Sequence, residues 1–381
     1  MATVGIIAEF NPLHKGHEYL ICEAKKLGQV VTVISGNFVQ RGDTAIASKE
    51  IRAKAALKSG IDLVAELPVL WSMSTAQNFA LGGISALVNL GCDTLIFGSE
   101  CGDIKPLIKI ADILTSSKFP RTLEKHLSEG ITFATARQRA CEELGAQKGI
   151  LDKPNNNLGI EYIVAAKKLG ANLQFKTVKR KGTQHDSLEI GEFVSATLLR
   201  EKLLQGDREF CRKYMSEEIL KLFTESELSD IKRLETGVLT TLRAKSKSEF
   251  RNLPDLSEGV ENKLYFAIRL ATSLDMLYNE IKVKRYPLAR VRRLVLSAFL
   301  GLNNSYFLKP LPYIRVLGFN NVGKEILKNA TPKVPIITKV SEIKDNEVFL
   351  TEAKTTDLYN LSLKSPKPSG SEYTFKLITE D

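Results

Sequence analysis

The sequence predicts an α/β protein with a parallel sheet in its first half and a mostly helical second half. Short apolar runs alternate with helical patterns through residues 1–205, which is typical of βαβ units joined by right-handed crossovers. Charged helical patterns dominate residues 206–381 instead, at 216–229, 258–281 and 289–300. We therefore expect two domains, with a boundary at 205/206.

The expected strands of the first domain are bounded by glycine, asparagine or proline. We predict strands at 3–8, 30–34, 63–67, 94–97 and 172–178, and helices at 18–27, 49–59, 76–89 and 161–169. Residues 105–147 show a mostly helical pattern, which we interpret as an excursion around the sheet. In open parallel sheets ligands bind beyond the carboxyl ends of the strands, so we expect a site in the loops there.

Composition narrows the class of protein. No apolar run approaches the length of a membrane span, and no charged leader precedes the first strand. The five cysteines are scattered without CxxC spacing, and with only four histidines they indicate neither a disulfide framework nor a metal site. We expect a cytoplasmic protein with no protein metal ligands, no membrane association and no obligate protein partner.

The most informative motif follows the first expected strand. It reads Phe10-Asn11-Pro12-Leu13-His14-Lys15-Gly16-His17, where the strand ends and a helix begins. A helix N-terminus favours anions, and neutral imidazoles donate hydrogen bonds to phosphate oxygens. Gly16 lets the backbone approach a nucleotide closely. We predict that His14 and His17 are catalytic phosphate-binding residues; the alternative is two surface histidines in a loop.

A second candidate phosphate site lies at 195–200. The hydroxyls of Ser195 and Thr197 stand at an expected helix start, and Arg200 follows one turn later. Hydroxyls, backbone N–H groups and a guanidinium together suit the distal phosphates of a triphosphate. The alternative is a serine N-cap with a solvated arginine on the helix face.

The positive charge is concentrated in one segment. The formal net charge of the chain is +10, and residues 281–330 contain ten Lys and Arg against one acid, Glu325. Such a local excess favours a polyanionic partner, although a charge run is often only a solvated helix face.

Together the two phosphate motifs resemble the HxGH nucleotidyltransferase superfamily. Further segments are similar to the bacterial tRNA(Met) cytidine acetate ligase family: SGNFVQRG (35–42), DLVAELP (62–68), FGSE (97–100), PNNNLG (154–159), KRKGTQHD (179–186) and YIRVLGFN (313–320). The similarity covers most of the chain and thins after residue 206. It implies a Rossmann-like HxGH nucleotidyltransferase domain at 1–205, which is catalytic, and a basic, helical, tRNA-binding domain at 206–381.

The resemblance implies a two-step reaction. ATP and acetate form acetyl-adenylate, and the acetyl group then passes to the wobble cytidine of elongator tRNA(Met) to give N4-acetylcytidine. The implied ATP-binding residues are Ile7, Ala8, Glu9, Phe10, Asn11, Pro12, His14, Gly16, His17, Gly98, Asn155, Asn156, Arg180, Ser195, Thr197 and Arg200. The implied tRNA-binding residues are Lys282, Lys284, Arg285, Arg290, Arg292 and Arg293.

Several points stay open at this stage. The sequence does not decide which of Asn155 and Asn156 contacts ATP. Mg²⁺ is expected to accompany the triphosphate, although no carboxylate is an obvious ligand. Glu66 is a candidate base for acetyl transfer, against its interpretation as a buried, hydrogen-bonded strand residue. The alternative functions are an adenylyltransferase acting on a phosphorylated metabolite and a non-catalytic protein that binds nucleotide and RNA.

Overall fold

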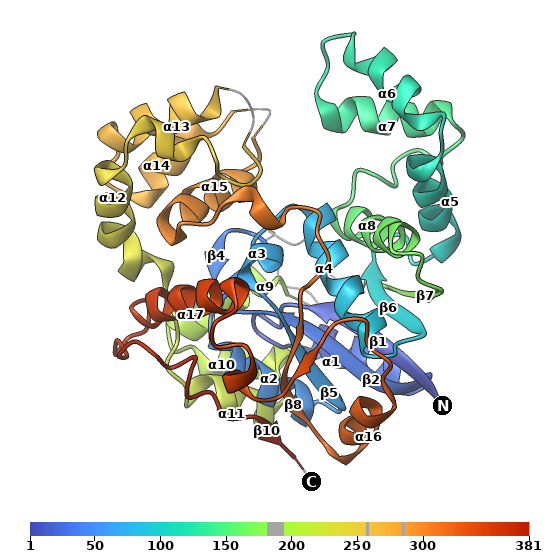
Figure 1. Ribbon diagram of the computed structural model, residues 1–381, viewed down its shortest axis with the longest axis vertical. Helices are drawn as coiled ribbons and strands as arrows, with labels where there is room; N and C mark the ends of the chain where they lie inside the picture. The colour runs from blue at the N-terminus through green and yellow to red at the C-terminus, as the bar shows by residue number, and fades with distance from the viewer. Residues whose placement is uncertain (181–193, 257–258, 284–285, 381) are drawn as a thin grey trace.

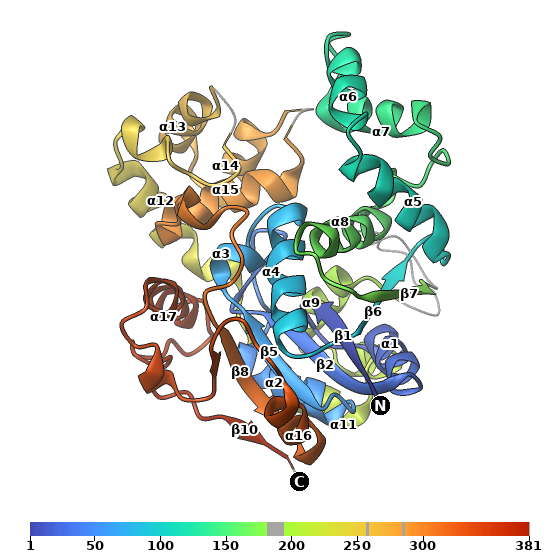
Figure 2. The same ribbon diagram turned by 45° about the vertical axis from the view of Figure 1, so that its right-hand side comes forward.

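The computed structural model describes residues 1–180, 194–256, 259–283 and 286–380. Within these residues a central sheet has the strand order β10-β8-β5-β2-β1-β6-β7, with β9 also paired to β8 (Figure 1 and Figure 2). Its strands are β1 (Ala2–Ala8), β2 (Gly28–Ser35), β5 (Leu63–Leu67), β6 (Thr94–Ser99), β7 (Gln174–Lys179), β8 (Ile314–Phe319), β9 (Ile336–Ile337) and β10 (Ile378–Thr379). A separate two-stranded hairpin consists of β3 (Phe38–Val39) and β4 (Asp43–Thr44). The predicted α/β class is confirmed.

The strands from the first half of the chain are parallel. Strand β1 pairs in parallel with β2 and β6, β2 with β5, and β6 with β7. Strand β8 runs antiparallel to β5, and β9 and β10 run parallel to β8. The carboxyl ends of the parallel strands therefore meet at one edge of the sheet, where the loops after β1 and β6 come together.

Helices cover both faces of the sheet, as a parallel sheet requires. Val4 and Ile6 of β1 pack with α1 (Lys15–Lys25), α2 (Lys49–Lys58), α9 (Ala196–Leu204), α10 (Arg208–Tyr214) and α11 (Glu217–Thr224). Ile7 points to the opposite face and packs with α4 (Ala76–Asn89) and α8 (Pro154–Lys168). The alternation of side chains along β1 thus supplies two separate apolar cores.

Two groups of helices project from the same end of the molecule (Figure 1 and Figure 2). One group contains α5 (Ile104–Thr115), α6 (Phe119–Leu127) and α7 (Phe133–Glu143), so the helical excursion expected at 105–147 is confirmed. The other contains α12 (Glu235–Ala244), α13 (Val260–Leu270), α14 (Leu274–Ile281) and α15 (Leu288–Leu300). No helix in the described ranges is long and apolar enough to cross a membrane.

The second group of helices shares its core with parts of the first half. Phe38 of β3 and Val69 of α3 (Val69–Ser72) pack into it, as does Tyr359 of α17 (Glu347–Asn360). The described 3-10 helices are η1 (Ile231–Leu234), η2 (Lys247–Phe250), η3 (Asn304–Tyr306) and η4 (Val340–Glu342), of which η1 and η2 add Leu234 and Phe250 to this core. The helices α12–α15 are therefore packed onto the loops beside the sheet.

The structure differs from the predicted division at 205/206. After the helices α12–α15 the chain returns to the sheet, where Phe319 of β8 pairs with Leu63 of β5. Strand β8 is followed by α16 (Asn321–Asn329), and β10 then pairs with β8. Residues that were assigned to a helical domain thus complete the sheet of the first domain. The short apolar run at 314–319 forms a strand by pairing with β5, which lies far away in the sequence.

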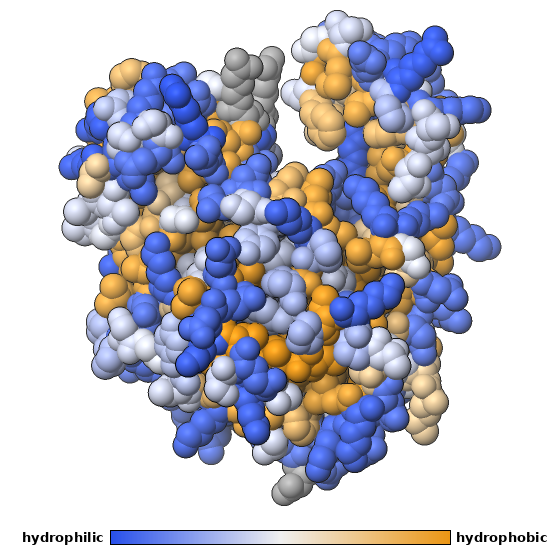
Figure 3. Space-filling model, in the orientation of Figure 1, coloured by the Kyte–Doolittle hydropathy of each residue, from blue (hydrophilic) through white to orange (hydrophobic). Residues whose placement is uncertain are grey.

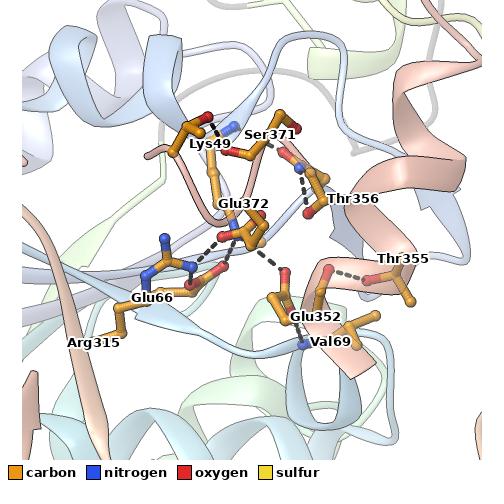
Figure 4. Close-up of polar contacts among 12 residues, drawn as sticks. Lys49, Glu66, Val69, Arg315, Glu352, Thr355, Thr356, Ser371 and Glu372 are labelled. Carbon is orange, nitrogen blue, oxygen red and sulfur yellow. Dashed lines mark hydrogen bonds and ion pairs between the residues drawn. The ribbon is translucent and has the colours of Figure 1, made fainter. Parts of the chain in front are cut away.

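A buried ion cluster fastens these returning segments to the sheet (Figure 4). Lys49 of α2 lies 2.5 Å from Glu66 of β5 and 2.7 Å from Glu372. It also lies 3.3 Å from Glu352 of α17. Arg315 of β8 pairs with Glu66 at 3.0 Å and contacts Glu372 as well. Burial and the neighbouring carboxylates raise the pKa of Glu352 to about 8. The cluster therefore joins α2, β5, β8, α17 and the C-terminal segment.

Candidate active site

A pocket opens at the carboxyl ends of β1 and β6, beside helices α1, α8 and α9. It lies at the edge of the sheet where the parallel topology places a ligand. The predicted nucleotide residues that line it are Ile7, Ala8, Glu9, Phe10, Asn11, His14, His17, Gly98, Asn155, Arg180, Thr197 and Arg200. Side chains from distant parts of the sequence are thus gathered around one cavity.

His14 is the N-cap of helix α1 and is held in one neutral form. Its Nδ1 accepts a hydrogen bond from the Gly16 amide at 3.1 Å, so the ring carries its proton on Nε2. Burial, together with the positive charge of Arg180, lowers the pKa of His14 to about 4. At neutral pH the ring is therefore an uncharged donor at a helix N-terminus, which suits a phosphate oxygen.

His17 is positioned by aromatic contacts one turn into the same helix. Its ring stacks on His14 with centroids 3.9 Å apart, and Phe10 packs edge-on against it at 5.2 Å. Phe10 has a φ of +47°, a left-handed conformation that costs a non-glycine residue about 1–2 kcal/mol. Its side chain is fully buried, and that packing holds the turn in place. Strain of this kind is typical of functional sites.

Arg180 is fixed above the end of β6. Its Nη1 donates to Asn155 Oδ1 at 3.1 Å, and Asn155 Nδ2 donates to Glu100 Oε1 at 2.7 Å. A Cβ at Gly98 would lie 3.2 Å from Arg180 Cγ, so glycine at this position leaves room for the arginine. These contacts hold the guanidinium in the wall of the pocket.

The two phosphate motifs touch each other across the pocket. Arg200 Nη1 donates to the Asn11 carbonyl at 3.0 Å, and its Nη2 donates to Thr197 Oγ1 at 3.1 Å. Asn11 is held in turn, because its Oδ1 accepts from the Ile46 amide at 2.7 Å. The guanidinium of Arg200 and the histidine loop therefore form one surface that can receive a polyphosphate.

Four of the predicted nucleotide residues do not line the pocket: Pro12, Gly16, Asn156 and Ser195. The Ser195 hydroxyl accepts a hydrogen bond from the Leu198 amide at 3.3 Å. Ser195 is therefore the N-cap of α9, which was the alternative interpretation of the 195–200 motif. The side chain of Asn156 is buried and accepts from the Glu100 and Cys101 amides. Of the two asparagines left open by the sequence, it is Asn155 that faces the pocket.

The structure excludes Glu66 as the base in this pocket. Its carboxylate is 1% exposed and is occupied by Lys49 and Arg315 in the buried cluster. Of the two roles that its sequence context allows, catalytic or structural, the contacts support the structural one.

Two of the predicted RNA-binding arginines are engaged in ion pairs. Asp255 pairs with Arg290 at 3.3 Å and with Arg293 at 2.9 Å. Arg293 Nη1 also donates to the Gln40 carbonyl at 3.1 Å, which joins α15 to a loop that lines the pocket. Both side chains are mostly buried, at 22% and 14% exposed. Their contacts attach the helices to the pocket wall.

The other basic residues of this segment have different surroundings. The Arg292 guanidinium lies over the Tyr278 ring at 5.5 Å and is partly exposed. Lys282 is exposed on the surface. Lys284 and Arg285 lie outside the described residues. Lys282 and Arg292 are therefore the described members of the predicted RNA surface that remain open to a partner.

Several pocket residues were missed by the sequence analysis. They are Leu20, Gln40, Arg41, Ala76, Phe79, Phe97, Pro154, Asn157, Leu158, Tyr162 and Ala196. Arg41 lies in the segment 35–42, which is similar to the ligase family. That similarity alone does not indicate which residue of the segment faces a ligand. Phe79 and Tyr162 follow the periodicity of core residues, so apolar patterning alone could not assign them to a pocket.

The charge of the pocket suits a polyanion. Arg41, Arg180 and Arg200 supply three guanidiniums, whereas Glu9 is the one acid among the described lining residues. No group of three or more His, Cys, Asp or Glu that could hold a metal occurs in the described part of the chain.

Comparison with known proteins gives a consistent set of relatives. Residues 1–373 match the family described as HIGH Nucleotidyl Transferase. The tRNA(Met) cytidine acetate ligase of Caldanaerobacter subterraneus is 40% identical over 96% of both chains. That of Thermoanaerobacter pseudethanolicus is 38% identical over 99% of this chain and 100% of its own.

Two solved structures are similar to this chain over its full length. Thermotoga maritima TmcAL bound with alpha-thio ATP has a TM-score of 0.91 at 29% identity and covers 100% of both chains. The apo form of the same protein has a TM-score of 0.93 at 29% identity, over 100% of this chain and 99% of its own.

Proposed function

Because the chain belongs to the HIGH nucleotidyl transferase family, and within it to the tRNA(Met) cytidine acetate ligases, we propose that it activates acetate with ATP and acetylates tRNA. The acceptor is the wobble cytidine of elongator tRNA(Met), and the product is N4-acetylcytidine. The observation that supports this most strongly is the pocket where a neutral His14 and the Arg200 guanidinium face one cavity.

In the first step an acetate oxygen attacks the α-phosphorus of ATP. A new P–O bond forms as the bond to pyrophosphate breaks, and negative charge shifts to the departing phosphates. His14 and His17 donate to the phosphate oxygens, while Thr197 and Arg200 hold the pyrophosphate. The protein's contribution is orientation and electrostatic stabilisation in a site arranged before the substrate arrives.

Nucleotide binding also uses the opposite wall of the pocket. Arg180, Asn155 and the backbone at Gly98 lie at the end of β6, and the backbone of residues 7–11 runs along the other side. A Mg²⁺ ion bound with the triphosphate would neutralise part of its charge.

In the second step the tRNA must bring its cytidine to the acyl group. The two projecting groups of helices stand apart at the top of the space-filling view (Figure 3). Lys282 and Arg292, the described basic residues of this segment that stay open to a partner, contact phosphates of the RNA. We infer a cytoplasmic enzyme, since its substrate is a translating tRNA.

The experiment that tests this function compares two histidine variants in both partial reactions. His17→Ala should reduce acetate-dependent exchange of labelled pyrophosphate into ATP by at least about 100-fold, because it removes a donor to the reacting phosphate. Binding of tRNA(Met) should remain. His126→Ala is the matched control, since His126 pairs with Glu129 and Glu143 on α6–α7.

The outcomes separate the three functions. If the wild-type protein exchanged pyrophosphate into ATP but made no acetylated tRNA, it would be an adenylyltransferase with another acceptor. Bound tRNA with neither exchange nor acetylation would indicate a protein that only binds its ligands. Unchanged exchange in His17→Ala would refute the role of the histidine motif.

A further inference from the structure

Glu9 is a carboxylate built into the wall of the nucleotide pocket. It follows the last residue of β1 and lines the cavity together with the two histidines. The Gln40 amide donates to its Oε1 at 2.8 Å, and Arg52 Nη1 donates to its backbone carbonyl at 2.7 Å. Main chain and side chain are both anchored, and Oε2 has no hydrogen bond among the described residues.

Three guanidiniums and one tyrosine surround this carboxylate. Arg52 of α2, Arg200 of α9 and Arg41 after β3 are the cations nearest to it, and Tyr162 of α8 faces it from the opposite core. Burial raises the pKa of Glu9, and the three guanidiniums and the Gln40 amide only partly offset that effect. A carboxylate in such surroundings is a stronger base than one in water.

Direct ATP binding gives this side chain no clear task. A carboxylate repels the triphosphate, whereas the arginines around it attract one. The second step, by contrast, releases a proton from the attacking amine. Guanidiniums do not accept protons, and His14 uses its acceptor nitrogen for the Gly16 amide. His17 is the other side chain that could take the proton, and we assign it to the first step.

We propose that Glu9 is the catalytic base of acetyl transfer, a role that rests on the function proposed above. The cytidine N4 lone pair forms a C–N bond with the acetyl carbonyl carbon. The C–O bond to the phosphate of AMP then breaks, and AMP leaves with that electron pair. The N4 proton passes to Glu9 and then to water. Before the reaction the same carboxylate accepts a hydrogen bond from the exocyclic amine, which selects cytosine over uracil.

The test measures the two steps separately in the isosteric variant Glu9→Gln. Acetate-dependent pyrophosphate exchange should fall far less than the transfer step. Single-turnover transfer from enzyme-bound acetyl-adenylate to tRNA should fall by about 10²–10⁴-fold, the usual contribution of a general base. Glu9→Asp should restore part of the transfer rate, because it keeps a carboxylate in the pocket.

A pH profile separates a base from a residue that only supports the fold. Wild-type transfer should slow as the pH falls through the pKa of Glu9, and this limb should be absent in Glu9→Gln. Asp43→Asn is the control, since Asp43 is a nearby carboxylate with a raised pKa, caused by burial, that does not line the pocket. Its acid limb should match that of the wild type.

Three results would overturn the assignment of Glu9. They are an equal loss of exchange and transfer, an unchanged transfer rate, and an acid limb that persists in Glu9→Gln. If the wild-type enzyme made no acetylcytidine at all, the proposed function would fall and this role with it. If the wild-type enzyme transferred acetyl to tRNA normally and Glu9→Gln did so at the same rate, only the role of Glu9 would be overturned.

Discussion

Replacing Lys49 by methionine should destabilise the protein strongly, because it leaves buried carboxylates without their shared cation. The Lys49 ammonium is 3% exposed and lies within 3.3 Å of three glutamates. Its removal leaves Glu66, Glu352 and Glu372 with Arg315 alone. Breaking a buried ion pair by deleting one partner costs about 3–5 kcal/mol.

That loss can be converted into a shift of the melting temperature. At about 2.1 cal/mol/K per residue, a chain of 381 residues that unfolds in one transition has an unfolding entropy of about 0.8 kcal/mol/K. A loss of 3–5 kcal/mol therefore lowers the midpoint by about 4–6 °C. Thermal unfolding followed by circular dichroism at pH 7.5 measures this shift.

Lys54→Met is the matched control on the same helix. Lys54 pairs with Glu50 at 2.8 Å, but both side chains are largely in solvent, and such pairs contribute about 0–1 kcal/mol. Its midpoint should stay within about 1 °C of the wild type. If Lys49→Met melted at the same temperature as this control, the Lys49 ammonium would not stabilise the buried cluster.

The cluster also predicts a direction for the pH dependence. Burial raises the pKa of Glu352 to about 8 in the wild type, and the loss of Lys49 would raise it further. A carboxyl whose folded pKa is raised destabilises the fold above its unfolded pKa, and that cost disappears as the pH falls. The gap in stability between Lys49→Met and the wild type should therefore narrow from pH 8 to pH 5.

The remaining predictions concern single positions of the pocket. Asn155→Ala should raise the KM for ATP several-fold with little change in stability, whereas Asn156→Ala should cost about 2 kcal/mol of stability by leaving two backbone N–H groups unsatisfied. Ser195→Ala should cost about 1 kcal/mol in urea unfolding and leave ATP affinity within twofold, since this hydroxyl caps α9. The pKa of His14 is lowered to about 4, so its ring stays neutral between pH 8 and pH 6. The rate of pyrophosphate exchange should therefore show no decrease in this range that is caused by protonation of His14.

The sequence predicted those features that depend on local patterns. The strand before His14 and the helix after it follow from short-range rules about turns and helix starts, whereas the cap at Ser195 was the alternative to the predicted phosphate contact. The parallel half of the sheet follows from the alternation of strands and helices. The pocket therefore lies where that alternation placed it.

What the sequence could not predict depends on long-range contacts. Phe319 lies beside Leu63 in the sheet although the two are far apart in the chain, so the run 314–319 could not be assigned to the sheet from its own pattern. Asp255 converts Arg290 and Arg293 from apparent surface charges into buried ion pairs. Charge counts along a sequence cannot detect such pairing.

One step along a helix also changes the role of a residue. Asn155 and Asn156 are neighbours near the start of α8, yet successive residues on a helix point about 100° apart. The first side chain faces the pocket, and the second turns into the protein to hold the Glu100 loop. A motif match assigns the segment to a site without deciding which of its residues faces the ligand.

The most direct test of the central claim follows labelled acetate into RNA. The pure protein is incubated with ATP, Mg²⁺, isotopically labelled acetate and elongator tRNA(Met), and the RNA is digested to nucleosides for mass spectrometry. A transcript with uridine at the wobble position serves as the control. We expect labelled N4-acetylcytidine from the native tRNA and none from the control. Release of AMP and pyrophosphate with no label in the native tRNA would contradict this claim.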